Sequence, residues 1–303
     1  MREEKLRAGK YDVDVPLVRR LIAAQFPQWA ELPITPVAHD GWDNWTFHLG
    51  ERMKVRLPSA VGYSEQAEKE ARWLPKLAPH LPLPVPVPLA IGVPGEGYPC
   101  SWSVYDWLEG ERVTRGGVED PVQFGWDLAM FLMALQRIDP AGGPPPGQHN
   151  YFRGADVMAV YGAEARRSIE AIADRIDAEG AHAVLDAAAA APFAASPAWL
   201  HGDIAIGNLL LREGRLGAVI DFGGCAVGDP ACDLVIAWTF LESAGRDSFR
   251  LSVAADAAMW ARARGWALWK AALLLASGQV VNADEAMPQA VIGAVIAEHR
   301  ALR

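Results

Sequence analysis

The chain has 303 residues, of which 51% are hydrophobic and 21% are charged. This length is long for one hydrophobic core and fits two lobes, and the composition excludes a disordered or fibrous protein. The net charge of −9 disfavours a nucleic-acid partner, because phosphate binding needs a basic surface, and is compatible with a cationic small molecule.

The sequence gives no sign of a membrane or of an oxidising compartment. Its apolar runs fall short of the about eighteen residues that a membrane span needs. The start, MREEKLRAGK, lacks the apolar core of a secretion signal. The three cysteines, Cys100, Cys225 and Cys232, cannot complete a disulfide framework. We therefore expect a cytoplasmic protein without a membrane partner, and the oligomeric state stays open.

The first third of the chain predicts a small antiparallel sheet preceded by a helix. Apolar residues at helical spacing place that helix within 12–30. Ile34–Leu49 predicts two strands joined by a turn at Asp40–Asn44, and Arg52–Leu57 predicts a third strand. A helix is expected at Ser64–Leu77, with Ser64 as its cap.

The remaining elements alternate with breakers. The proline-rich stretch 79–99 must be extended, and Trp102–Gly110 predicts a strand that ends in a connector between lobes. Helices are expected at 121–138, in the alanine-rich segment 156–191, at 234–241, at 247–276 and at 284–301.

The densest set of chemistry-bearing residues lies between Ala198 and Asp233. His201-Gly202-Asp203 is followed five residues after the aspartate by Asn208, and Asp221-Phe222-Gly223 ends an apolar run. The intervening Arg212–Arg215 suits a hairpin turn, which would bring Asp203, Asn208 and Asp221 to one end. Two carboxylates and a carboxamide suit Mg²⁺, which prefers few hard oxygen ligands and keeps phosphates and water. Taken singly, each residue also fits an ordinary turn or cap.

This spacing resembles the kinase catalytic loop and its metal-binding motif. Together with the later Gly228-Asp229-Pro230-x-x-Asp233, it is similar to the aminoglycoside phosphotransferase and choline kinase superfamily, and most of all to the antibiotic-phosphotransferase branch. The resemblance implies an α+β, bilobal, protein-kinase-like fold. A nucleotide-binding lobe with a small antiparallel sheet would span 1–108, and a mainly helical catalytic lobe 109–303.

The resemblance also implies roles in the central stretch. Asp203 would orient the substrate hydroxyl and accept its proton, while Asn208 and Asp221 would hold Mg²⁺ on the phosphates of ATP or GTP. Asp233 would brace the catalytic loop or contact the substrate.

In the first lobe the resemblance points to the turn, the third strand and the following helix. Asn44 would approach the nucleotide from a turn that holds only one glycine, Gly41. Arg56 occupies the position of the usual nucleotide-pairing lysine, with Lys54 on the same strand face as its competitor. Glu70 would pair with the strand base.

The connector between lobes would bind the nucleotide base. Adenine would stack near Tyr105 or Trp107, while the backbone around Asp106–Leu108 would hydrogen-bond its edge. Because backbone recognition leaves no side-chain signature, ATP and GTP stay open.

The acceptor is predicted to be an aminoglycoside-like hydroxyl compound. Acidic residues after the central stretch would pair with its ammonium groups; they are Asp229, Glu242, Asp247, Asp284 and Glu285. A tryptophan-rich cleft would instead suit a macrolide, and a choline-like metabolite is a further alternative. The single-glycine turn and Arg56 keep open a nucleotide-binding protein without phosphotransferase activity.

Overall fold

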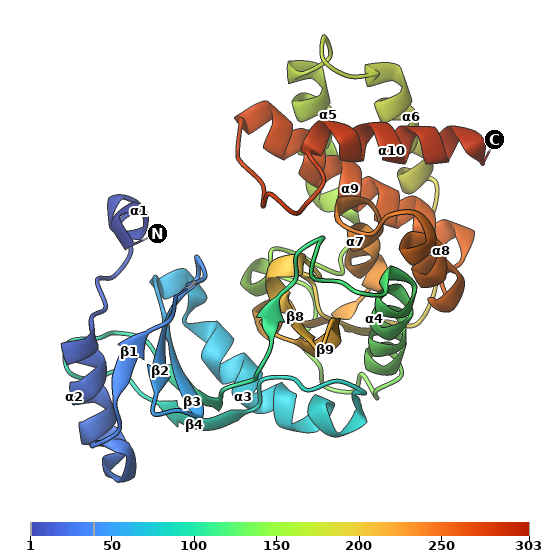
Figure 1. Cartoon of the computed structure of the whole chain (residues 1–303). Helices are drawn as coiled ribbons and strands as arrows, with labels where there is room; N and C mark the ends of the chain where they lie inside the picture. Colours follow the sequence, from blue (N-terminus) through green and yellow to red (C-terminus); the bar gives the residue numbers. More distant parts are fainter. Residues whose placement is uncertain (1, 39, 303) are drawn as a thin grey trace. The chain divides into compact units, whose positions relative to one another are not determined.

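The computed structural model describes residues 2–38 and 40–302 and divides into two compact units (Figure 1). The N-terminal unit ends at Glu109 and the C-terminal unit begins at Gly110, except that the short segment His80–Leu83 belongs to the C-terminal unit. Within the described residues, no helix has the length and apolarity that crossing a membrane would require.

The N-terminal unit is built on a five-stranded antiparallel sheet, as predicted. Its order is β1-β2-β3-β5-β4, and the strands are β1 (Ile34–Pro36), β2 (Asn44–Leu49), β3 (Met53–Pro58), β4 (Pro88–Gly92) and β5 (Trp102–Asp106). His39, which the first predicted strand included, lies outside the described residues.

Three helices accompany this sheet: α1 (Arg2–Arg7), α2 (Val15–Gln25) and α3 (Glu65–Leu77). The helix α2 lies within the predicted 12–30: Asp14 caps its start, and it ends just before Pro27, which begins a separate 3₁₀ turn. Its buried face, Val18, Leu21 and Ile22, packs into the same core as the strands. The sequence did not predict α1, whose six residues are mostly charged and carry no apolar periodicity.

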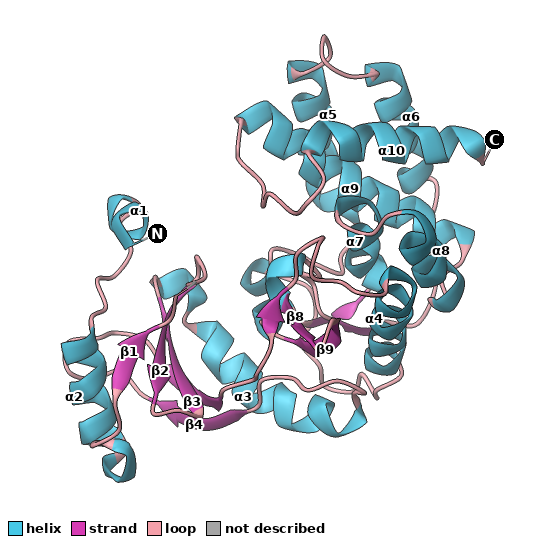
Figure 2. Cartoon of the chain, in the orientation of Figure 1, coloured by secondary structure: helices cyan, strands magenta, loops and turns pink. Residues whose placement is uncertain are grey.

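The C-terminal unit is mainly helical, as the coloured elements of Figure 2 show. Its helices are α4 (Pro121–Gln136), α5 (Val157–Ala171), α6 (Ala178–Ala189), α7 (Ile236–Thr239), α8 (Ser243–Ser252), α9 (Ala257–Ser277) and α10 (Pro288–Ala301). The helix α9 is buried along most of its length and packs against α5, α6 and α10. It therefore forms the centre of this helical layer.

Capping aspartates divide two of the predicted helical segments. The segment predicted as one helix at 247–276 is divided between α8 and α9, because Asp256 accepts a hydrogen bond from the backbone N–H of Met259 and starts a new helix. The alanine-rich insert is likewise divided between α5 and α6, the second of which begins at the cap Asp177.

Two small sheets lie within this helical unit. One pairs β7 (Ala198–Leu200) with β10 (Ala226–Gly228), and the other joins β6 (Glu111–Arg112), β8 (Leu209–Arg212) and β9 (Arg215–Val219). The predicted hairpin β8–β9 is confirmed, with Arg212 opposite Arg215. Its two turn residues, Glu213 and Gly214, have φ of 53° and 69°, the left-handed pair that matches strand twist in tight hairpins.

Candidate active site

The loop that follows β7 is held by one buried carboxylate. Asp233 accepts hydrogen bonds from the backbone N–H groups of His201 and Gly202, both at 2.8 Å. Burial raises the pKa of Asp233, while His201 and these two donors act in the opposite direction. A carboxylate that uses one oxygen for each of two consecutive amides fixes the start of the loop.

The side chain of His201 links this loop to the end of β9. Its Nδ1 accepts a hydrogen bond from the Asp203 backbone N–H at 3.2 Å, so the ring proton lies on Nε2, which donates to the Ile220 carbonyl at 3.0 Å. The imidazole also packs edge-on against Phe222, with ring centroids 4.6 Å apart. His201 thus joins the turn at Asp203 to the residues around Asp221.

Gly202 allows two loops to meet backbone to backbone. Its φ is +86°, and a Cβ at this position would lie 2.3 Å from the carbonyl oxygen of Gly224. Both the left-handed conformation and the close approach require glycine. The glycine of the His-Gly-Asp motif therefore has a steric reason.

The structure brings together the three residues that the sequence proposed for chemistry. Asn208 donates from Nδ2 to the backbone oxygen and to Oδ2 of Asp203, both at 2.9 Å. The Asn208 carbonyl accepts a hydrogen bond from Ile220 N–H at 2.9 Å, which places Asp221 beside it. Asp221 itself has φ of 66°, a strained conformation for a non-glycine residue that is common at functional sites.

The donor set of this cluster fits a hard divalent cation. Asn208 directs its amide N–H group to Asp203, which leaves its Oδ1 as an oxygen ligand, and Asp221 adds a carboxylate. Among residues 2–38 and 40–302, no group of three His, Cys, Asp or Glu side chains is arranged to hold a metal. A site with so few protein ligands suits Mg²⁺, which keeps water and substrate phosphates as its other ligands.

A second polar cluster lies in the N-terminal unit, where β3 faces α3. Arg56 places Nη1 3.3 Å from both carboxylate oxygens of Glu70, which is almost fully buried. The hydroxyl of Tyr105 donates to Glu70 Oε2, and burial beside this carboxylate raises the pKa of Tyr105. The Lys54 ammonium lies 5.6 Å from the centroid of the Tyr105 ring. Arg56 therefore forms an ion pair with the helix glutamate Glu70.

This geometry changes the interpretation of the connector. Tyr105 is 1% exposed and its hydroxyl is bound to Glu70, so it supports the ion pair and is not available to stack on a base. Trp107 is half-buried, its ring centroid lies 4.3 Å from that of His48 with the two rings tilted by 43°, and its backbone N–H donates to the Arg52 carbonyl. Asp106 is exposed and Leu108 half-buried, and both stay candidates for the nucleotide base.

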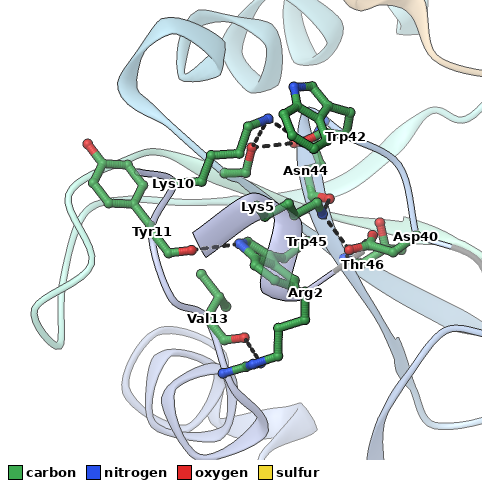
Figure 3. A network of polar contacts seen from close by, with 11 residues as sticks. Arg2, Lys5, Lys10, Tyr11, Val13, Asp40, Trp42, Asn44, Trp45 and Thr46 are labelled. Carbon is green, nitrogen blue, oxygen red and sulfur yellow. Dashed lines mark hydrogen bonds and ion pairs between the residues drawn. The ribbon is translucent and has the colours of Figure 1, made fainter. Parts of the chain in front are cut away.

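The turn that carries Asn44 is held by a residue that the sequence did not single out. Figure 3 shows Lys5 of α1 reaching the turn. Its Nζ donates to Asp40 Oδ2 at 2.6 Å and to the Asn44 carbonyl at 2.7 Å, and lies 4.0 Å from the centroid of the Trp45 ring. Lys5 is fully buried, and this desolvation lowers the pKa of its ammonium group. A short charged helix gives no sequence signal for such a role.

A pocket opens beside Asp203, within the C-terminal unit. It has about 860 Å³ of empty space, counting the part open to solvent. Most of its wall is apolar and includes Ile204, Val235, Trp266, Leu274, Val281 and Val291. Three charged side chains, Arg153, Lys270 and Glu285, join Asp203 in the lining. Burial, and then the charge of Asp203, raises the pKa of Glu285.

The acids that the sequence favoured for substrate binding have other contacts. Asp229 is buried and bound by Arg262 at 2.6 Å, and Asp233 holds the loop that carries Asp203. Glu242 pairs with Arg115 at the surface. None of these three lines the pocket, and Glu285 is the predicted acid that does. Residue type alone does not distinguish an acid that pairs with a buried arginine from one that faces a ligand.

Two further lining residues, Lys270 and Arg153, were missed. Lys270 had a weak signal, because it follows Trp266 and precedes Leu274 by four residues each, which puts one lysine in an apolar helix stripe. Arg153 lies in a loop without periodicity and carried no signal.

Residues 34–266 match the model of the phosphotransferase enzyme family. A search of curated proteins found no match. Among solved structures, the chain is similar to the GDP complex of aminoglycoside 2'-phosphotransferase-IIIa, with 18% identity, a TM-score of 0.64 and coverage of 96% of this chain and 99% of that one. It is also similar to the macrolide 2'-phosphotransferase MphH from Brachybacterium faecium, with 19% identity, a TM-score of 0.55 and coverage of 94% and 97%. At these identities the likeness shows the fold, and the predicted kinase-like fold class is confirmed.

Proposed function

Because the chain belongs to the phosphotransferase enzyme family, we propose that it transfers the terminal phosphate of ATP or GTP to a hydroxyl group of a small molecule bound in the pocket beside Asp203. The observation that carries this proposal is the joint placement of Asp203, at the wall of that pocket, and of Asn208 and Asp221 at the adjoining hairpin end.

Asp203 is the proposed general base. Asn208 holds its Oδ2, which leaves Oδ1 to accept a hydrogen bond from the acceptor hydroxyl. As the hydroxyl oxygen bonds to the terminal phosphorus, its proton passes to Asp203, and the bond to the nucleoside diphosphate breaks. A positioned base of this kind typically contributes roughly 10²–10⁴-fold to the rate.

Asn208 Oδ1 and the Asp221 carboxylate are the proposed ligands of Mg²⁺. When bound, the ion would neutralise charge on the phosphate oxygens, which is the main requirement of phosphoryl transfer. In the N-terminal unit we assign Arg56 to the nucleotide phosphates, because Glu70 holds its guanidinium in place and the planar N–H donors of a guanidinium match phosphate oxygens. Lys54 shares that strand face and is proposed as a second phosphate contact.

The pocket wall bears on the acceptor. Its apolar side chains, with Trp266 among them, favour a molecule with a large apolar surface. The aminoglycoside-like acceptor predicted from the sequence is the second candidate, supported by Glu285, which can pair with an ammonium group. Such a polycation would also have to approach Arg153 and Lys270, whose like charges oppose it.

Asp203→Asn tests the proposal. Phosphate transfer, followed as a mass increase of one phosphate on an acceptor, should fall by about 10²–10⁴-fold. Nucleotide binding by calorimetry should stay within about twofold, because the carboxamide keeps the shape of the side chain. Asp174→Asn, an exposed acid in the turn after α5, is the matched control and should leave transfer unchanged. Turnover of Asp203→Asn at the wild-type rate would refute the assignment.

A further inference from the structure

Two cations in the pocket have no part in the transfer step described above. Arg153 and Lys270 both line the pocket that contains Asp203. Within the part of the chain that the structure describes, neither side chain forms an ion pair with a carboxylate. With Asp203 facing the reacting hydroxyl, Glu285 is the one lining acid left to oppose two positive charges.

Arg153 is held in place by a strained loop. Tyr151 and Phe152 have φ of 52° and 53°, a conformation that costs energy for residues other than glycine and persists only where the surroundings enforce it. The buried Asn150 supplies that enforcement, since its Nδ2 donates to the Arg153 carbonyl at 2.9 Å and to the Gly224 carbonyl at 3.2 Å. The loop therefore fixes Arg153 next to the catalytic residues.

The guanidinium of Arg153 is also oriented. Its Cζ lies 5.2 Å from the ring centroids of both Trp266 and Trp269, a cation–π arrangement. Contact with the indoles uses the face of the group and leaves N–H donors at its edge. The edge of an oriented guanidinium is well suited to the oxygens of a carboxylate.

Lys270 brings a second cation to the same space. It projects from α9 between Trp266 and Leu274, both of which line the pocket. Burial, and next the charge of Arg153, lowers the pKa of its ammonium group. Two like charges near one another in a partly apolar pocket repel, and an anion bound between them would relieve that repulsion.

The remaining wall of the pocket is mostly apolar. The indole of Trp266, which is 1% exposed, belongs to this wall. The pocket thus combines an apolar wall with two cations and, besides Asp203, one acid.

We propose that the acceptor carries a carboxylate on an otherwise largely apolar body, and that Arg153 and Lys270 bind this carboxylate while Asp203 receives the hydroxyl. The inference rests on the proposed function and narrows its substrate class to hydroxylated carboxylic acids. It disfavours polycationic acceptors, because their ammonium groups would find only one acid to pair with, Glu285, and would be repelled by Arg153 and Lys270.

The test uses matched compounds and does not need turnover. Three hydroxylated scaffolds, a cyclohexane, a phenyl and a sterol, are each prepared as the carboxylate, the primary amide and the amine. Binding to the full chain is measured by calorimetry at neutral pH without nucleotide. On the scaffold that binds best, the carboxylate should bind at least tenfold more tightly than the amide. Equal or tighter binding of the amide or amine on every scaffold, or no carboxylate binding, overturns the inference.

Two variants at one position assign the effect to Lys270. Lys270→Met should weaken binding of the carboxylate about tenfold and leave the amide unchanged, whereas Lys270→Glu should reverse the preference towards the amine. Arg167→Met removes an exposed charge of the same unit and is the control. A weakening of carboxylate and amide alike would show a structural role and contradict the assignment.

The two proposals can fail separately. If carboxylates bind with this dependence on Lys270 but no phosphate is transferred, the proposed function fails and the binding site stands. If neutral or cationic hydroxyl compounds are phosphorylated and carboxylates are neither bound nor modified, the proposed function stands and the carboxylate site is refuted.

Discussion

Two turns of this protein are each held by a single buried ion, and they differ in where that ion comes from. The Asp203 loop is held by Asp233, whose carboxylate accepts backbone hydrogen bonds from His201 and Gly202 and which lies in a continuously buried segment. The Asp40–Asn44 turn is held by the ammonium of Lys5, which belongs to a separate six-residue helix near the start of the chain.

The Asp203 loop is held more firmly than the Asp40–Asn44 turn. Asp233 lies in a segment that is buried without a break from Gly228 to Leu234, so its position is fixed by packing as well as by its bonds. In α1, Lys5 is the one buried residue, and a helix this short is marginal by itself. We therefore expect the Asp40–Asn44 turn to open at lower free-energy cost than the Asp203 loop.

The largest effect is expected from Asp233→Asn. The carboxamide can accept from only one of the two amides, and its own N–H group would face the other as donor against donor. We expect the free energy of unfolding to fall by about 3 kcal/mol, since a buried donor is left without a partner. The displaced loop should also lower kcat by about 10²-fold or more. Urea unfolding and steady-state transfer measure the two quantities.

Asp229→Asn is the matched control, because Asp229 is equally buried but binds Arg262 instead of the Asp203 loop. Asp229→Asn should lower the free energy of unfolding by a similar amount as Asp233→Asn, but it should lower kcat much less. If both variants lose kcat to the same degree, Asp233 does not position the loop in any specific way.

Lys5→Met should have a smaller effect, on the turn of the N-terminal unit. Methionine keeps the length of the side chain but leaves Asp40 and the Asn44 carbonyl without this donor. Because burial already lowers the pKa of Lys5, part of the lost bonding is offset by relief of desolvation, and we expect about 1–2 kcal/mol of lost stability. If the turn contacts nucleotide, as the family resemblance implies for Asn44, KM for nucleotide should rise several-fold with kcat nearly unchanged.

Lys10→Met provides the comparison within the same segment. Lys10 donates to the Trp42 carbonyl and to Ser59 from a more exposed position, so its removal should change KM less than the removal of Lys5 does.

Hydrogen exchange gives a second readout for Lys5→Met. The amides of the Asp40–Asn44 turn should exchange faster in this variant, and unchanged protection would count against the dependence of the turn on α1.

The same contrast explains what the sequence could predict. The antiparallel sheet, the helical C-terminal unit, the β8–β9 hairpin and the gathering of Asp203, Asn208 and Asp221 all follow from signals that lie close together in the chain. Support by remote residues leaves no such signal, and so Lys5, Arg153 and Lys270 were missed.

Burial also limited what could be predicted from the sequence, because it depends on contacts across the fold. An aromatic residue in the connector suggested base stacking for Tyr105, but its hydroxyl is bound to a glutamate that comes from a helix 35 residues earlier. Asp229 was read as available for a substrate, and its partner Arg262 comes from a helix that the sequence identified only by its apolar residues. Partners across the fold decided both roles.

The smallest effect concerns Glu285, a half-buried acid in the pocket beside the Asp203 loop. Burial and the charge of Asp203 raise its pKa in the folded protein above the ordinary 4.5. Between pH 4.5 and the pKa of Glu285 in the folded protein, the folded state therefore binds more protons than the unfolded state, and stability falls as pH rises through that window.

The variant Glu285→Gln has no carboxyl group that titrates at this position. The stability of the wild type minus that of Glu285→Gln should thus decline from the acid to the alkaline side of the window, by less than about 1 kcal/mol because solvent screens the group. Urea unfolding in steps of pH upward from 4 measures the difference, and a difference that rises with pH would show that Glu285 is instead stabilised in its charged form by the two pocket cations.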